Sequence, residues 1–149
     1  MPTALAEPAD PVLLAEALRP ALLRVSRRLR QESQKVGVSS TEALVLGQIK
    51  RNPGVGVCDL ADAEQISRPT MSSHVKRLEA AGWIGRDEAQ QDDRRRVGIR
   101  LTAKGLKALD AIRRRRNDWL AARLSTLSSE ARAALAAAAQ PLAQLAGDR

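Results

Sequence analysis

SRPTMSSHVKRLEAAGWIGRDEAQQDDRRRVGIRL, residues 67–101, contains the pattern of a short helix, a sharp stop and a hairpin. Met71, Val75 and Leu78 recur at helical spacing, so they form one apolar face that packs against the rest of the protein. Gly82 stops this helix, because glycine readily adopts the left-handed backbone that ends many helices. The stretch therefore predicts a helix with one buried face and one face left for solvent or a partner.

The other face of this predicted helix is basic and rich in hydroxyl groups. No acidic residue occurs between Glu64 and Glu79, so the sequence predicts an unopposed positive surface. Lys and Arg reach guanine edges or phosphates, and Ser and Thr bond to bases or phosphates without adding bulk. A solvated helix surface is the alternative. The residues expected to contact the DNA major groove are Ser67, Arg68, Pro69, Thr70, Ser72, Ser73, Lys76 and Arg77.

A hairpin is predicted after the helix. Trp83-Ile84 begins one strand, and Val97, Ile99 and Leu101 alternate as the returning strand. An arginine at a hairpin tip enters the narrow minor groove, where the negative potential is strongest, and a neighbouring carboxylate can orient it. A solubilising turn of balanced charge is the alternative, and which arginine lies at the tip is left open. The expected minor-groove residues are Asp93, Arg94, Arg95 and Arg96.

A groove-binding helix followed by an arginine-rich hairpin is the layout of a winged helix-turn-helix. We therefore predict a mainly α fold with a small β-wing, flanked by N- and C-terminal dimerisation helices. Residues 1–9 are expected to form a loose tail, 38–101 the DNA-binding domain, and 10–37 with 102–148 a helical dimerisation region.

The flanking helices carry apolar stripes that the small central unit is too small to cover. A second copy of the chain is the expected partner, and docking of a different protein is the alternative. The residues expected at the dimer interface are Leu14, Leu18, Leu22, Leu120, Leu124, Leu135, Leu142 and Leu145. Pro141 is expected to kink or interrupt the last helix.

Local signals define further elements. Ser39 and Glu42 have the spacing of a capping box, which predicts a helix from about residue 40 to Lys50. Val55 and Val57 alternate with a glycine, enough for a very short strand. Four arginines, residues 113–116, sweep around a long helix, so we expect mainly a solvated face, with phosphate contacts or pairing across a dimer as the alternative.

Composition favours a polyanionic partner inside a reducing compartment. The 149 residues carry a net charge of +8, with a pI of about 10.9. Cys58 is the single cysteine, so no internal disulfide is possible, and an inert structural thiol is favoured over an oxidant sensor. The sequence shows no signal-peptide pattern and no membrane-spanning run, and we predict a cytoplasmic protein.

Enzyme chemistry finds little support in the sequence. No glycine-rich phosphate loop, HExxH pattern or Cys–His pairing is present, and the carboxylates are scattered among basic residues. His74 is the single histidine and has no cysteine near it that would complete a metal site. We predict no catalysis, no metal and no cofactor.

With these residues in place, the chain resembles the multiple antibiotic resistance regulator (MarR) family of bacterial transcription factors. The resemblance runs from about residue 12 to 147 and rests on VSSTEALVLGQI, CDLADAEQISRPTMSSHVKRLEAAGWI, DRRRVGIRLTAKG and LSSEARAAL. The most specific part is the Asp-Arg-Arg wing followed by Leu-Thr-x-x-Gly. The loop between Arg86 and Asp93 is longer than usual in the family and lacks its customary proline.

The resemblance implies an obligate homodimer that places two recognition helices in successive major grooves of a pseudo-palindromic operator. It implies that Asp93 orients Arg95 into the minor groove. Family members are most often repressors, and many release DNA when a small molecule binds between the dimerisation helices and the DNA-binding unit. Because aromatic residues are scarce, an effector pocket here is expected to be aliphatic, with Trp119 as a candidate wall.

Two rival functions remain open at the level of sequence. The same basic surface would serve a non-specific nucleic-acid or nucleoid-binding protein, and the helical stripes would serve a protein-interaction module.

Overall fold

Side-chain caps start most of the helices in the computed structural model, which describes residues 10–87 and 98–147. Backbone N–H groups at helix starts need an acceptor, and Ser, Thr and Asp side chains supply it. The elements are α1 (Pro11–Gln34), α2 (Ser40–Arg51), α3 (Val57–Glu64), α4 (Arg68–Ala80), β1 (Ile84–Arg86), β2 (Ile99–Leu101), α5 (Ala103–Ser125) and α6 (Ser129–Ala146). The cap acceptors are Asp10, Ser39, Ser67, Thr102 and Ser128.

The predicted fold class is confirmed: helices dominate, and the two strands form a small antiparallel sheet. Ile84 pairs with Leu101 and Arg86 with Ile99. The capping box at the start of α2 is also confirmed, because the Ser39 hydroxyl accepts from the Glu42 N–H and the Glu42 carboxylate accepts from the Ser39 N–H, both at 3.1 Å.

The predicted short strand at Val55 and Val57 is only half right. Val55 forms an isolated bridge with Ile99, in which the Ile99 N–H donates to the Val55 carbonyl at 2.9 Å. Val57 instead opens α3, with extended Gly56 as its N-cap. Alternation over three residues is too short to distinguish a strand from the approach to a helix.

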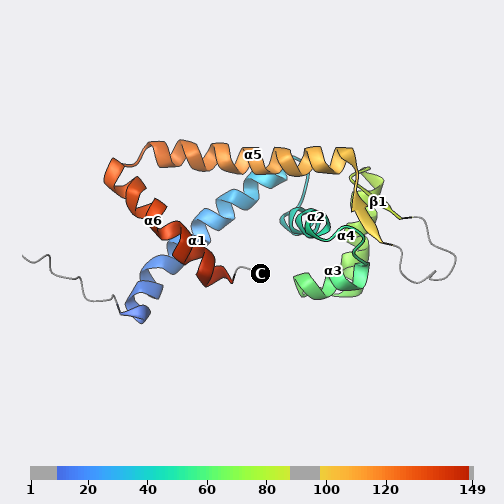
Figure 1. Ribbon diagram of the computed structural model, residues 1–149, viewed down its shortest axis with the longest axis horizontal. Coiled ribbons are helices and arrows are strands. Elements are labelled where there is room, and N and C mark those ends of the chain that lie inside the picture. The colour runs from blue at the N-terminus through green and yellow to red at the C-terminus, as the bar shows by residue number, and fades with distance from the viewer. Residues whose placement is uncertain (1–9, 88–97, 148–149) are drawn as a thin grey trace, which may run out of the picture.

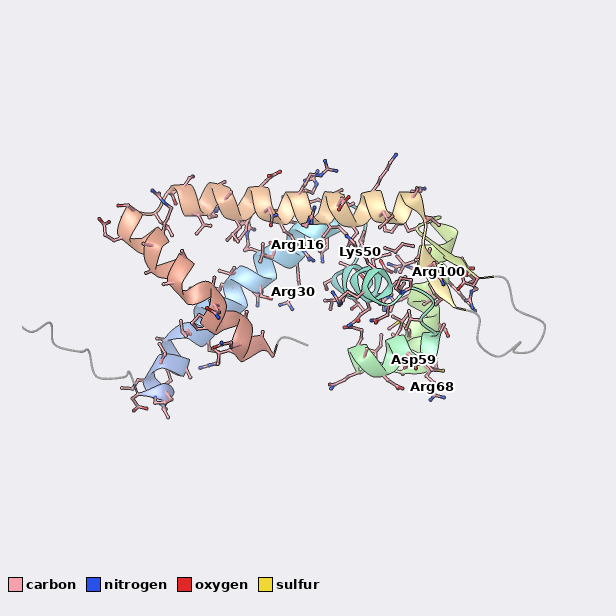
Figure 2. The ribbon with its side chains drawn as sticks, viewed as in Figure 1. Arg30, Lys50, Asp59, Arg68, Arg100 and Arg116 are labelled. Carbon is pink, nitrogen blue, oxygen red and sulfur yellow. The ribbon has the colours of Figure 1, made fainter. Side chains whose placement is uncertain are left out.

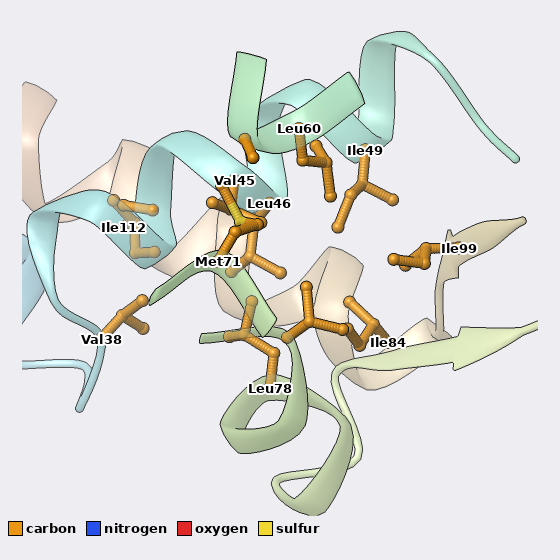
Figure 3. Packing of buried hydrophobic residues seen from close by; sticks show 13 residues of the cluster. Val38, Val45, Leu46, Ile49, Leu60, Met71, Leu78, Ile84, Ile99 and Ile112 are labelled. Atoms are coloured by element: carbon orange, nitrogen blue, oxygen red, sulfur yellow. The ribbon is translucent and has the colours of Figure 1, made fainter. Parts of the chain in front are cut away.

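The core lies among α2, α3, α4 and the sheet, and it takes one side chain from α5 (Figure 3). The predicted buried face of α4 is confirmed, since Met71, Val75 and Leu78 are all buried. Ile112 brings α5 into the same cluster. The other large buried members are Val38, Val45, Leu46, Ile49, Leu60, Ile84 and Ile99.

Helix α5 connects the two ends of the molecule. Figure 1 shows it running from the sheet and α4 at one end to α1 and α6 at the other. Near its middle, Arg116 donates to the Leu29 carbonyl at 3.2 Å and to the Ser33 hydroxyl at 3.1 Å, which ties α5 to α1. This orientation of one helix on the other sets where α1 lies relative to the core.

Helix α6 runs without a break through Pro141. Of the two expected effects of Pro141, an interruption of this helix is therefore wrong, and a kink stays a prediction. Proline removes one helical hydrogen bond, and the alanine- and leucine-rich turns on both sides keep theirs. No residue of α6 is buried against the rest of the described chain. None of the helices in the described ranges combines the length and apolar character needed to cross a membrane.

Candidate nucleic-acid interface

Helix α4 presents its polar face at the surface of the molecule. Its apolar face is fixed by Met71, Val75 and Leu78, so the residues between them point outward. In Figure 2, Arg68 lies at the outer edge of α3 and α4, on the side away from α5. The predicted contact residues are exposed except Ser72, which is half-buried; the exposed ones are Ser67, Arg68, Pro69, Thr70, Ser73, Lys76 and Arg77.

Several hydroxyl groups on this face already have partners within the helix. The Ser67 hydroxyl accepts from the Thr70 N–H at 3.3 Å and lies 2.7 Å from the Thr70 hydroxyl. The Ser73 hydroxyl donates to the Pro69 carbonyl at 3.2 Å. Each oxygen keeps capacity for a further hydrogen bond, so these groups are held in fixed positions and remain usable by a ligand.

The positive charges of α4 differ in their surroundings. Arg68 and Lys76 are exposed and form no ion pair within residues 10–87 and 98–147. Arg77 forms an ion pair with Glu42 of α2, although its own side chain is 66% exposed. The predicted unopposed positive face is therefore wrong at Arg77 and holds at Arg68 and Lys76.

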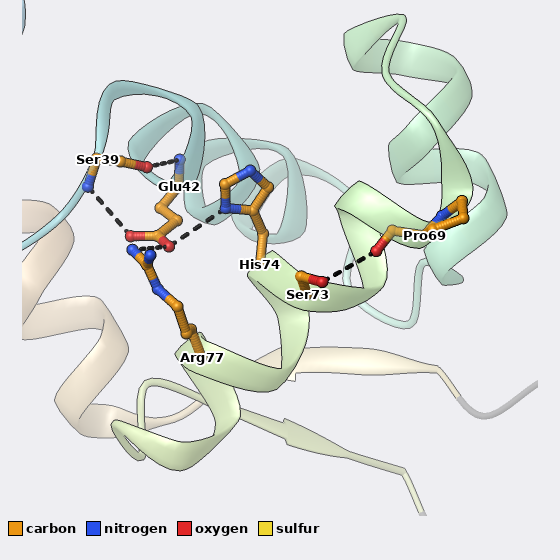
Figure 4. Close-up of polar contacts among 6 residues, drawn as sticks. All are labelled: Ser39, Glu42, Pro69, Ser73, His74 and Arg77. Carbon is orange, nitrogen blue, oxygen red and sulfur yellow. Dashed lines mark hydrogen bonds and ion pairs between the residues drawn. The ribbon is translucent and has the colours of Figure 1, made fainter.

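Glu42 is a site residue that the sequence did not reveal as such. Its carboxylate is buried, and Oε1 faces both Arg77 and the Nδ1 atom of His74, the latter at 3.3 Å. Figure 4 shows both side chains of α4 reaching toward it. The capping-box spacing predicted the carboxylate's local partner, whereas its pairing with residues more than thirty positions later depends on the packing of α2 against α4.

The base of the hairpin carries two ion pairs. Arg86 Nε lies 3.3 Å from Glu79 Oε1, which links β1 to the end of α4. Arg100 Nε lies 2.7 Å from Asp87 Oδ1 and joins the two strands across the hairpin. The predicted minor-groove residues Asp93, Arg94, Arg95 and Arg96 lie outside the described residues.

The leucines expected at a dimer interface fall into two groups. Exposed in the single chain are Leu14, Leu22, Leu135 and Leu145, whereas half-buried are Leu18, Leu120, Leu124 and Leu142. Val12, Leu13 and Leu23 of α1 are exposed as well. The chain thus leaves much apolar surface of α1 and α6 in solvent, more than isolated exposed leucines would give.

The four-arginine run divides in the way that helical geometry requires. Arg116 turns inward to α1, and partial burial lowers the pKa of its guanidinium. Arg114 and Arg115 are exposed, and Arg113 lies 3.7 Å from Asp110 of the same helix. The expected solvated face is confirmed for Arg113, Arg114 and Arg115, and the inward role of Arg116 was missed.

A pocket of about 330 Å³ lies between α2 and α5. Leu44, Leu109 and Ile112 supply apolar wall, and Asp110 also lines it. Its cationic lining consists of Lys50, Arg51, Arg113 and Arg116.

Trp119 does not line this pocket. Two guanidinium groups lie over its ring, Arg28 at 5.8 Å and Arg123 at 5.9 Å from the ring centroid, distances that suit cation–π attraction. Its indole N–H is buried without an acceptor among the described residues. The contact between Arg28 of α1 and Trp119 of α5 thus helps to hold the two helices together.

Cys58 is exposed in the first turn of α3, two positions after the Gly56 cap. The cap itself is Gly56, which forms no side-chain hydrogen bond.

Comparison with known proteins agrees with this architecture. Residues 36–96 match the sequence model of the MarR family. An HTH-type transcriptional regulator of Mycobacterium leprae is 30% identical over 132 residues, covering 89% of this chain and 92% of the relative. A similar regulator of Mycobacterium bovis is 31% identical over 126 residues, 85% of this chain and 87% of the relative.

Solved structures have the same fold. A transcriptional regulator from Pseudomonas aeruginosa superposes with a TM-score of 0.79 at 30% identity, covering 95% of this chain and all of the other. A mutant of MepR from Staphylococcus aureus, solved bound to an oligodeoxyribonucleotide, gives 0.68 at 22% identity over 88% of this chain and 96% of MepR. The helical architecture, the α4 surface and these relatives together lead to one assignment: the chain belongs to the MarR family of DNA-binding transcriptional regulators.

Proposed function

We propose that the protein is a homodimeric, sequence-specific regulator that represses transcription from pseudo-palindromic operators. The observation that carries the proposal is the exposed face of α4. Arg68 and Lys76, which form no ion pair with any residue that the structure describes, border hydroxyl groups that intrahelical bonds hold in place. A helix with small polar residues and free cations on one face suits the major groove, where both bases and phosphates lie within reach.

The dimer is supported by the exposed apolar side chains of α1 and α6. A two-fold partner would cover Leu14, Leu22 and Leu135 and would place two copies of α4 on one face of the duplex. Half-sites about one helical turn apart, roughly 34 Å, then follow for the operator. In this proposal residues 10–37 and 102–148 form the dimerisation region and residues 38–101 the DNA-binding domain.

The wing is assigned to the minor groove. Asp93, Arg94, Arg95 and Arg96 follow β1 in the chain and precede β2, whose Arg100 pairs with Asp87 at the hairpin base. Asp93 is proposed to orient Arg95, by the bidentate geometry that carboxylates and guanidinium groups favour.

An effector is proposed for the pocket between α2 and α5. Leu44 and Leu109 suit an aliphatic chain, and Lys50 with Arg51 suits a carboxylate. Since α2 carries Glu42 and α5 carries Arg116, an occupant would contact elements of both the core and the flanking helices. The proposed result is release of the operator.

Selection from random duplex DNA at a stated salt concentration tests the proposed sequence-specific DNA binding. The full-length protein should enrich an inverted repeat and bind it roughly a thousandfold more tightly than shuffled DNA. Lys76→Ala should weaken binding, while Lys107→Ala, an exposed lysine on α5, serves as the control. Enrichment of no sequence with tight binding to all DNA would instead show a non-specific nucleic-acid binder, and failure to bind DNA would favour a protein-interaction module.

Repression and effector binding need separate measurements. A reporter with the selected repeat across its promoter should fall in output when the protein is expressed; a rise would show an activator. For the pocket, octanoate should raise the thermal transition of the protein and weaken operator binding, and octanol is the uncharged control. Arg51→Gln should remove the octanoate response. Equal responses to octanoate and octanol would reject the anionic-ligand assignment.

A further inference from the structure

Glu42 presents an unusual energetic situation for an acidic residue in a basic protein. Its side chain is 3% exposed, so its carboxylate has given up nearly all of its water. Burial of an ionised carboxylate costs several kcal/mol unless donors replace the lost water. The donors around Glu42 therefore determine whether this arrangement is stable, and they include two residues of the DNA-facing helix.

Three groups surround the carboxylate. Oε2 accepts from the Ser39 N–H at 3.1 Å, which starts α2. Oε1 faces His74 Nδ1 at 3.3 Å and the Arg77 guanidinium. His74 and Arg77 lie three positions apart on α4 and hence on one side of that helix (Figure 4). A rotation of α4 about its axis would carry both partners away from the buried charge.

The ion pair between Glu42 and Arg77 also changes the electrostatics of the exposed face of α4. A guanidinium balanced by a carboxylate attracts distant phosphates less than a free one does. Arg77 is so balanced, whereas Arg68 and Lys76 have no such partner among residues 10–87 and 98–147. Arg77 keeps further N–H donors on an exposed side chain, so it can still direct a hydrogen bond.

We propose that Glu42 is a positioning residue for DNA reading: its buried carboxylate fixes the rotation of α4 through His74 and Arg77 and holds the Arg77 guanidinium in one pose. Glu42 touches no DNA. Its contribution is discrimination between sequences, and it reduces the general attraction of Arg77 to phosphate. This inference rests on the proposed sequence-specific function.

Glu42→Gln tests the inference with little change in shape. The amide oxygen still accepts from the Ser39 N–H, so the start of α2 is kept, while the charge that holds Arg77 is lost. On the repeat selected by the unmodified protein, E42Q should bind about tenfold more weakly, the effect of losing roughly 1.4 kcal/mol. On a shuffled duplex it should bind more tightly, with the slope of log K against log salt steeper by about 0.9 per protomer.

Glu32→Gln is the matched control. Glu32 is also buried and also pairs with a cation, Lys35 at 2.7 Å, but it lies at the end of α1. The same change in net charge there should leave the ratio of selected to shuffled affinity and the salt slope as in the unmodified protein. An E42Q protein with a lower thermal transition but an unchanged ratio and slope would overturn the proposal, because it would show a purely structural carboxylate.

Arg77→Gln gives an independent test. Because it leaves the buried Glu42 carboxylate without its guanidinium partner, the thermal transition of this variant is measured as well, and E42Q/R77Q removes both charges together. The ratio of affinities should fall in R77Q. In E42Q/R77Q, which removes both charges of the pair, the salt slope on shuffled DNA should stay as in the unmodified protein, because the pair carries no net charge. Equal weakening on both duplexes with a slope shallower by about 0.9 per protomer would identify an ordinary phosphate contact and reject the proposal. In the E42Q/R77Q protein the loss of discrimination should match the larger single loss; additive losses would also reject it.

The proposed function fails in a different way from this inference. If the unmodified protein enriches no repeat, sequence-specific reading is rejected and the role of Glu42 in it is rejected as well. If it enriches a repeat and E42Q behaves as E32Q does, the regulator stands and only the positioning role is lost.

Discussion

Gly105 of α5 lies directly against the carbonyl oxygen of Trp83, and a Cβ atom at Gly105 would overlap that oxygen. Thr102 holds this contact in place. Its hydroxyl accepts from the Gly105 N–H at 3.1 Å and donates to the Gly82 carbonyl at 2.6 Å. Through the Thr-x-x-Gly pattern that follows β2, the first turn of α5 therefore packs directly against the chain that leaves α4.

Gly105→Ala should destabilise the protein by about 1–3 kcal/mol, because the added methyl group meets backbone atoms that have no freedom to move away. Urea unfolding followed by circular dichroism measures the change. Gly47→Ala in α2 is the control: its Cβ would have only an ordinary 3.6 Å contact with the Arg51 side chain, and it should stabilise the helix by roughly 0.5–1 kcal/mol. Equal behaviour of the two variants would contradict the close approach.

Arg116→Met should cost about 1–3 kcal/mol of unfolding free energy, since the Leu29 carbonyl and the Ser33 hydroxyl lose their donor at the junction of α1 and α5. Arg115→Met, one residue earlier and exposed, should change the free energy by less than about 0.5 kcal/mol. Denaturant titration of both variants decides between an anchoring arginine and a solvated run; indistinguishable midpoints would reject the anchor.

The lowered pKa of Glu130 predicts the direction in which the stability of the protein changes at acid pH. Its own backbone N–H, and then the hydroxyls of Ser128 and Ser129, lower the pKa of this carboxyl below its ordinary value of 4.5. A lowered pKa in the folded state stabilises the fold fully above the ordinary value, and the stabilisation disappears as pH falls through the folded pKa. The thermal transition should therefore fall more steeply below about pH 4.5 in the unmodified protein than in Glu130→Gln. A steeper fall in the variant would give the opposite sign.

Leu22→Glu should convert the proposed dimer into a monomer at micromolar concentration, because a charge would enter the apolar surface that a second copy is proposed to cover. Sedimentation velocity reports the mass directly. Leu106→Glu is the control, as Leu106 is similarly exposed but lies in the first turns of α5, beside the sheet. An unmodified protein that sediments as a monomer would remove the dimer and strengthen the case for a different helical partner.

Arg95→Ala should weaken binding to the selected repeat by about 1–3 kcal/mol if its guanidinium enters the minor groove as proposed. Asp93→Asn should have a smaller effect in the same direction, because it removes only the orienting partner. Fluorescence anisotropy with labelled duplex measures both. Unchanged affinity in R95A together with loss in Arg94→Ala would move the wing contact by one residue.

Local signals predicted the local structure well. Ser39, Ser67, Thr102 and Ser128 all cap helices, because a cap depends on a side chain and an N–H only two or three residues apart. The helical spacing of Met71, Val75 and Leu78 predicted the buried face of α4, because this pattern also depends on residues only a few positions apart.

Features that depend on tertiary packing were not visible in the sequence. Glu42 and Arg77 are 35 positions apart, and neither residue type predicts that the two side chains pair. Arg116 looks like its three arginine neighbours until α1 packs against it. The pocket likewise arises where α2 and α5 meet. Trp119 lies farther along α5 than the residues that line the pocket, and it contacts Arg28 of α1 instead.

Helix α5 is a continuous element of 23 residues, which corresponds to a rod roughly 34 Å long. One end is fixed to the strands and to α4 by Thr102, and farther along the helix Arg116 forms a hydrogen bond with α1. A rod of that length converts an angle into a translation: tilting it by about 6° displaces its far end by about 3.5 Å, close to the ~3.4 Å spacing of successive bases along a strand. In the proposed dimeric regulator, a molecule that wedges α2 away from α5 by a few degrees would thus change the separation of the two α4 helices by about one base-pair step.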